Sequence, residues 1–102
     1  MADVRISSLR ALVDARRDEI KAIVSRHHGR SVALFGSVAR GTEHDRSDLD
    51  LLVEFEPGTR PFELLLLGAE LEEALGVSVD VATAESLRPE IRADVVAESV
   101  AL

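Results

Sequence analysis

Residues 31–56 read SVALFGSVARGTEHDRSDLDLLVEFE, and they contain two predicted strands with a polar turn between them. Residues 31–35 form a short apolar run that ends at Gly36, which predicts a buried strand. Residues 48–56 alternate in part before Pro57-Gly58 and predict a second strand. The small and polar residues 36–45 between them predict a loop with about one helical turn.

Upstream of this stretch, residues 6–28 predict one amphipathic helix, because apolar residues recur there at mostly helical spacing. These residues are Ile6, Leu9, Val13, Ile20 and Val24. Ser7 or Ser8 can cap the start of the helix, and Gly29 can end it.

Downstream, residues 61–75 predict a second helix, with Pro61 suited to its first position and Gly76 to its C-terminal cap. Gly68 inside it costs about 1 kcal/mol relative to alanine, which suggests close packing against a strand. Residues 77–81 predict a third strand, and residues 83–102 a turn and a last helix with Pro89 near its start.

This order of elements predicts an α/β (α+β) sandwich, a small mixed β-sheet with helices packed on it, in a single domain spanning residues 1–102. Three Phe and no Trp or Tyr leave Leu, Val, Ile and Ala to build the core. We expect a modest core, and association with other chains through spare apolar helix surface is plausible.

The charge balance restricts the possible partners. The formal net charge is -7, with 19 acidic and 12 basic residues, so we expect no stable nucleic-acid binding by the isolated chain. There is no cysteine, no apolar signal core at the start and no apolar run long enough to span a bilayer. A cytoplasmic protein without membrane contact is the expectation.

Asp48 and Asp50 are the first candidate site residues. In a strand, residues i and i+2 share a face about 6.6 Å apart, so Leu49 and Leu51 then point to the core. Two neighbouring carboxylates repel each other, and a divalent cation with a preference for oxygen ligands, such as Mg²⁺, removes that penalty. The alternative is two solvated acids at the exposed start of a strand.

Asp80 lies in an otherwise apolar strand, where a lone carboxylate is costly to bury unless it is paired or metal-bound. If the third strand lies beside the second, Asp80 joins Asp48 and Asp50 as a third carboxylate. The alternative is a strand-end acid that is hydrogen-bonded to a turn.

Gly36, Ser37 and Arg40 are candidate phosphate ligands. Glycine lets the backbone approach a ligand closely, N–H groups at a following helix start favour anions, and the Ser37 hydroxyl can add a hydrogen bond. Arg40, one turn on, can clamp a phosphate oxygen. An ordinary strand-to-helix turn would show the same Gly-Ser pair.

Taken together, these segments resemble the signature of the DNA polymerase β-like nucleotidyltransferase superfamily. The family pattern is Gly-Ser, a gap of about ten residues, Asp-x-Asp and a later acid on a neighbouring strand. Here it is carried by GSVARG at residues 36–41, SDLDLLV at 47–53 and VDV at 79–81. The Ala39-Arg40-Gly41 extension, Ser47 and the LRPEIR stretch at residues 87–92 resemble the minimal nucleotidyltransferase branch.

The resemblance implies transfer of AMP from ATP to a hydroxyl acceptor by two-metal phosphoryl transfer. By this resemblance Asp48 and Asp50 hold two Mg²⁺ ions, and Asp80 completes the second metal and helps the acceptor hydroxyl lose its proton. It also implies a nucleotide site formed by Gly36, Ser37, Arg40 and Ser47. No nucleophilic side chain of this chain is required.

The resemblance further implies an antitoxin-type protein encoded beside a helical HEPN-type toxin, whose side chain would accept AMP. Two alternatives stay open: a binding-only antitoxin that blocks its toxin by contact, and a small-molecule nucleotidyltransferase completed by a second chain. His27 and His28 near a helix end are better explained as cations at a helix C-terminus than as metal ligands. His44 and Asp45 fall in the loop and are interpreted as solvated.

Overall fold

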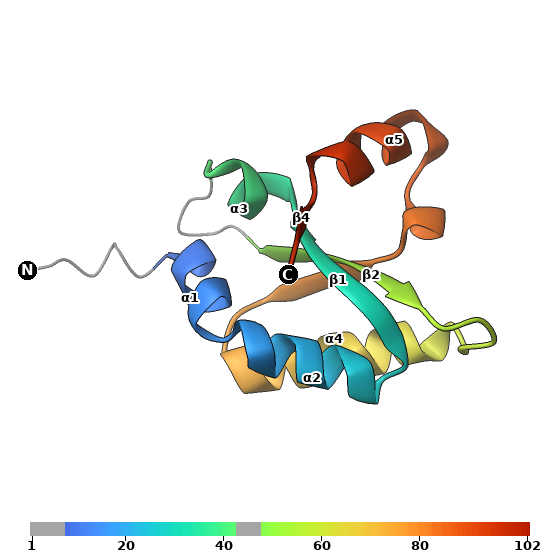
Figure 1. The fold of residues 1–102 in the computed structure, drawn as a ribbon, viewed down its shortest axis with the longest axis horizontal. Helices are drawn as coiled ribbons and strands as arrows, with labels where there is room; N and C mark the ends of the chain where they lie inside the picture. Colours follow the sequence, from blue (N-terminus) through green and yellow to red (C-terminus); the bar gives the residue numbers. More distant parts are fainter. Residues whose placement is uncertain (1–7, 43–47) are drawn as a thin grey trace, which may run out of the picture.

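The computed structural model describes residues 8–42 and 48–102, and within them the chain forms a four-stranded sheet in the order β3-β2-β1-β4. The strands are β1 (Gly29–Phe35), β2 (Leu49–Phe55), β3 (Val79–Ala82) and β4 (Val100–Ala101). β1 is antiparallel to β2 and β4, whereas β2 and β3 are parallel. The predicted mixed sheet is therefore confirmed (Figure 1).

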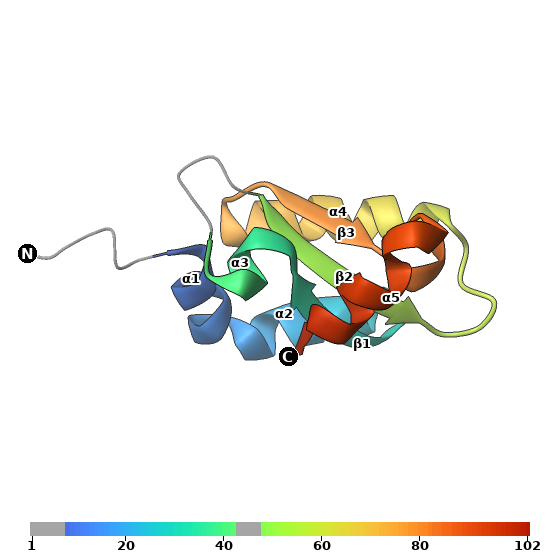
Figure 2. The same cartoon turned by 90° about the horizontal axis from the view of Figure 1, so that it is seen from above.

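Helices cover the sheet on two sides. α2 (Arg17–Arg26) and α4 (Phe62–Leu75) pack against one face, and α5 (Pro89–Glu98) lies over the other (Figures 1 and 2). The short helix α3 (Gly36–Arg40) continues directly from β1 at the sheet end where β2 begins. Since α4 connects β2 to the parallel strand β3, it is the crossover that brings the two strands side by side.

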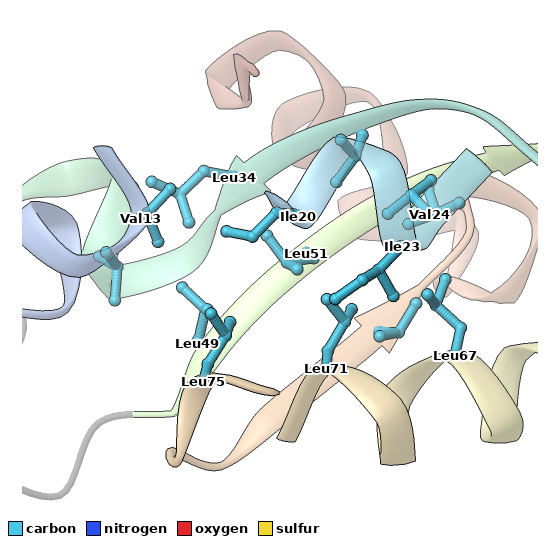
Figure 3. Close-up of a cluster of buried hydrophobic side chains, with 14 residues drawn as sticks. Val13, Ile20, Ile23, Val24, Leu34, Leu49, Leu51, Leu67, Leu71 and Leu75 are labelled. Atoms are coloured by element: carbon cyan, nitrogen blue, oxygen red, sulfur yellow. The ribbon is translucent and has the colours of Figure 1, made fainter. Parts of the chain in front are cut away.

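The core lies between the sheet and the α2–α4 layer (Figure 3). Leu34, Leu49 and Leu51 from the strands are fully buried against Ile20 of α2 and Leu71 of α4. No buried polar or charged residue occurs in the part of the chain that the structure describes. In those same segments, no helix has the length and apolar character needed to cross a membrane.

The prediction of one continuous helix over residues 6–28 is wrong. The chain breaks at Arg16 and forms two helices, α1 (Leu9–Ala15) and α2. Arg16 leaves helical geometry (φ −112°, ψ 19°), and its Nη2 donates a 2.8 Å hydrogen bond to the Ala74 carbonyl near the end of α4. Ser8 caps α1 by accepting from the Ala11 N–H at 3.1 Å, so this predicted cap is confirmed.

Gly29 does not end the helix as predicted. α2 closes at His27, His28 takes the left-handed conformation (φ 71°), and Gly29 opens β1. A Cβ on Gly29 would lie 2.3 Å from Val24 Cγ1, so the glycine allows β1 to pass closely over α2. This packing requirement arises from the turn that folds β1 back over the end of α2, and the residue pattern alone does not report it.

The C-terminal quarter also differs from prediction. The chain forms a short 3₁₀ turn η2 (Ala84–Ser86), then α5 with Pro89 in its first turn as expected, and then β4 instead of further helix. β4 pairs Val100 with Leu34 of β1. A two-residue strand is stabilised by the neighbouring edge of the sheet, which local sequence patterns do not report.

α4 matches its predicted C-terminal boundary and is capped by Gly76 in the left-handed conformation (φ 73°), while Pro61 sits at the N-cap instead of the first helical turn. An added Cβ on Gly68 would lie 3.7 Å from Val81 Cγ2, which is ordinary van der Waals contact. Gly68 thus faces β3 as suggested, but this packing does not require a glycine.

His27 joins α2 to α4 through two carboxylates. Its Nδ1 lies 2.7 Å from a Glu63 oxygen and its Nε2 lies 2.6 Å from a Glu70 oxygen, and Arg26 also pairs with Glu70. Burial of the ring disfavours the charged form and is the largest single influence, but the hydrogen bonds to Glu70 and Glu63 outweigh it and raise the pKa of His27 above 6.5. The hydrogen bond from His27 is the main cause that lowers the pKa of Glu70 below 4.5.

Replacing His27 by glutamine is expected to lower the free energy of unfolding more at pH 6 than at pH 9. Because the pKa of His27 is raised in the folded state, its contribution to the free energy of unfolding is fully present below pH 6.5. This contribution is lost as the pH rises through the pKa of His27 in the folded protein. Because the pKa of Glu70 is lowered in the folded state, its contribution is present above pH 4.5 and is lost as the pH falls through its folded pKa. The interaction of His27 with Glu70 is therefore strongest between pH 4.5 and pH 6.5. Urea unfolding at the two pH values measures the difference, and an equal loss at both would contradict it.

Candidate active site

The site is built on adjacent parallel strands. Asp50 of β2 and Asp80 of β3 are register partners, so their side chains leave the same face of the sheet. Leu49 and Leu51 point the other way and are fully buried, which fixes the register of β2 and the direction of Asp50. Asp48 directly precedes β2 and is exposed, as is Asp80.

The three aspartates act on one another electrostatically. The pKa of Asp50 is raised from 3.8 to about 6, first by partial burial and then by the negative charges of Asp80 and Asp48. Arg40 opposes this shift but does not cancel it. The structure therefore brings the three predicted acids to one end of the sheet, with Asp50 at their centre.

The carboxylates are not gathered into a closed ligand cage. Within residues 8–42 and 48–102, no three His, Cys, Asp or Glu side chains stand close enough together to hold a metal ion as they are placed. Asp48 and Asp80 are exposed and have room to rotate, whereas Asp50 is partly buried. A cation would have to draw the two outer carboxylates inward toward Asp50.

Gly36 forms the wall beside Asp50. Phe35 is the register partner of Asp50 on β1, and Gly36 follows in the left-handed conformation with φ 76°. A Cβ at Gly36 would lie only 2.2 Å from Asp50 Oδ2. Both the backbone conformation and the space left for the carboxylate thus require glycine at this position.

Ser37 and Arg40 follow on α3. Val38 is fully buried and anchors this one-turn helix, and the Ser37 carbonyl accepts a 2.9 Å hydrogen bond from the Thr42 N–H. Arg40 is exposed, and its guanidinium lies 4.0 Å from the Glu98 carboxylate of α5. The sequence around the Gly-Ser motif does not predict this contact with Glu98. Ser47, His44 and Asp45 lie outside the described residues.

The arrangement defines a class of enzyme. Carboxylates that repel one another on neighbouring strands are oxygen ligands of the kind that suits divalent cations, and a glycine bend and an arginine lie beside them. Such an arrangement is typical of enzymes of phosphoryl-group transfer.

The model of the nucleotidyltransferase domain family matches residues 17–102, and the chain belongs to this family. It is a nucleotidyltransferase, which confirms the identification made from the sequence.

Relatives of similar length cover most of the chain. A protein adenylyltransferase, MntA, of Thermococcus cleftensis is 31% identical over 98% of this chain and 98% of its own. A Methanocaldococcus jannaschii protein named as a candidate protein adenylyltransferase is 39% identical over 80% of this chain and 88% of its own.

Solved structures share the fold. A structure described as a candidate minimal nucleotidyltransferase has a TM-score of 0.81 at 40% identity and covers 91% of this chain and 95% of its own. A Shewanella oneidensis complex of an MNT antitoxin with a tri-AMPylated HEPN toxin has a TM-score of 0.66 at 19% identity, over 86% of this chain and 69% of its own. This second likeness shows the fold alone.

Proposed function

We propose that this nucleotidyltransferase transfers AMP from ATP, with Mg²⁺, to a side-chain hydroxyl of a HEPN-type partner toxin and so acts as its antitoxin. The observation that carries the proposal is the position of Asp50, which lies between Gly36 and Asp80 on one face of the sheet with its pKa raised to about 6. The adenylyltransferase relatives and the AMPylated toxin complex support the choice of group and acceptor.

The three aspartates fit Mg²⁺ by their chemistry. Asp50 carries an unfavourable negative charge beside Asp48 and Asp80, and a divalent cation would relieve this repulsion. Asp48 and Asp50 would hold two Mg²⁺ ions and Asp80 would complete the second. When bound, the metal supplies charge neutralisation for the triphosphate and for the departing pyrophosphate.

The remaining residues position the substrates. Gly36 leaves room for the Asp50 carboxylate beside the bend. A phosphate group would bind at this bend, and the Ser37 and Ser47 hydroxyls would donate hydrogen bonds to it. Arg40, exposed beside the site, would leave Glu98 and donate to a phosphate oxygen. The Asp80 carboxylate would accept the proton of the attacking hydroxyl.

The test is transfer of label from α-³²P-labelled ATP to the product of the adjacent gene, the proposed HEPN-type partner, in the presence of Mg²⁺. Label is expected on that protein with the wild-type chain and not with Asp48→Asn. Asp94→Asn, an exposed aspartate on α5, is the matched control and is expected to behave as wild type.

Two other results would point to other functions. Neutralisation of the toxin by Asp48→Asn without label would show a binding-only antitoxin. Label that appears on a small molecule but not on the protein would show a small-molecule nucleotidyltransferase. Either result would overturn the proposed protein adenylyl transfer.

A further inference from the structure

The outer face of α4 carries an apolar stripe that nothing in the described chain covers. Phe62 and Leu65 are 62% and 63% exposed, and Leu66 is 43% exposed. With the exposed Ala69, they follow the i, i+3, i+4, i+7 spacing of one helix face, and we call these four residues the α4 stripe. The opposite face of α4 already supplies the core through Leu67, Leu71 and Leu75, so the stripe is not required for folding.

An open groove runs beside the stripe, between α4 and β3. Its volume is about 270 Å³. It is lined by Leu64, Leu65, Gly68, Ala69, Glu72 and Val79–Val81. The absence of a side chain at Gly68 keeps the groove open, and β3 is an edge strand of the sheet (Figure 2). The groove therefore connects the α4 stripe to Asp80.

We propose that the α4 stripe and this groove form the docking surface for the protein that accepts the nucleotide, which rests on the proposed function. The acceptor hydroxyl has to reach Asp80, and this groove, which is lined by both Leu65 and Asp80, joins Asp80 to the α4 stripe. Large exposed apolar side chains in register on one helix face mark a protein interface. The partner would present the apolar face of a helix, which binds along this groove.

Charge defines the partner further. Glu72 and Asp80 both line the groove, and the chain as a whole has a formal net charge of -7. A partner ridge flanked by lysine or arginine is complementary to these acids. A second copy of this chain would place like charges against each other across the same groove, which disfavours self-association through this face.

The test uses Leu65→Gln, with Ile91→Gln as its matched control. Ile91 is 39% exposed and lies on α5, over the other face of the sheet. With the product of the adjacent gene, the proposed HEPN-type partner, as probe, Leu65→Gln is expected to raise both the dissociation constant and the KM for that protein about tenfold or more. The thermal shift by MgATP and the rate at saturating acceptor stay unchanged, and Ile91→Gln changes neither constant.

Each other outcome overturns the inference in a distinct way. Unchanged affinity of Leu65→Gln, with transfer by the wild type intact, overturns the docking surface and leaves the proposed function standing. No complex and no transfer with the wild type overturn both. A wild-type chain that dimerises in analytical ultracentrifugation, with Leu65→Gln monomeric, assigns the stripe to a second copy and contradicts the proposed occupant.

Discussion

Asp50→Asn is expected to reduce nucleotidyl transfer by roughly 10³-fold or more while the fold stays intact. The amide keeps the shape of the side chain but removes the central negative charge among the three acids. Because a divalent cation beside the triphosphate contributes several kcal/mol to transition-state stabilisation, loss of its central ligand removes most of the rate. Single-turnover transfer from labelled ATP measures the effect.

The same substitution is expected to stabilise the protein in the absence of metal. Because the pKa of Asp50 is raised from 3.8 in the unfolded chain to about 6 in the folded protein, the ionised carboxylate destabilises the fold. The free energy of unfolding therefore includes the full contribution of the protonated carboxyl below pH 3.8. This contribution is lost as the pH rises through about 6. At pH 8 the gain should be about 1–2 kcal/mol, reduced from the full effect of the shift because the side chain is partly exposed to solvent. The gain should vanish near pH 4.

Glu54→Gln is the control for both effects. Glu54 is exposed on the same strand, four residues beyond Asp50, and its contact with the Ser31 hydroxyl is long at 3.5 Å. This variant is expected to keep wild-type activity, and its stability should not rise at pH 8. An Asp50→Asn protein that still transfers nucleotide at the wild-type rate would remove Asp50 from the reaction.

Gly36→Ala is expected to lower transfer by about 100-fold while reducing stability by only about 1–2 kcal/mol. The left-handed backbone at φ 76° is strained for alanine, which accounts for the loss of stability. The new Cβ would lie 2.2 Å from Asp50 Oδ2, and the carboxylate can relieve this contact only by rotating out of its place. Activity then falls because the carboxylate is displaced by an ångström or more.

Gly76→Ala is the control that separates the effect of backbone strain from the effect of displacing the Asp50 carboxylate. Gly76 has a similar backbone conformation (φ 73°), but a Cβ there meets no atom within 4 Å and the residue caps α4 away from Asp50. Urea unfolding should show similar losses for the two variants, and the transfer assay should show a loss only for Gly36→Ala. Equal activity in both would mean that the space beside Asp50 is not needed.

The elements with strong local patterns could be predicted from the sequence. β2 follows from Leu49, Leu51 and Val53 on one face, and the end of α4 follows from Gly76. The Gly-Ser and Asp-x-Asp motifs were also recognised from the sequence, because their spacing resembles the nucleotidyltransferase pattern. These features depend on residues close together in the chain.

The features that were missed depend on distant partners. The break at Arg16 places its guanidinium on the Ala74 carbonyl, which is 58 residues away in the chain. β4 exists because β1 offers an unpaired edge, and Glu98 reaches Arg40 only after α5 has crossed the sheet. Such contacts appear only when the whole fold is assembled, which is why periodicity and spacing did not reveal them.

The parallel pairing of β2 with β3 makes the reactive centre a product of global chain assembly. Asp50 and Asp80 are neighbours only because α4 carries the polypeptide back along the sheet, and the segment that must close between them spans residues 51–79. Detachment of the four-residue edge strand β3 would separate Asp80 from Asp50 and withdraw Val81 from the core. The proposed catalytic centre therefore depends on one short edge strand of the sheet staying in place.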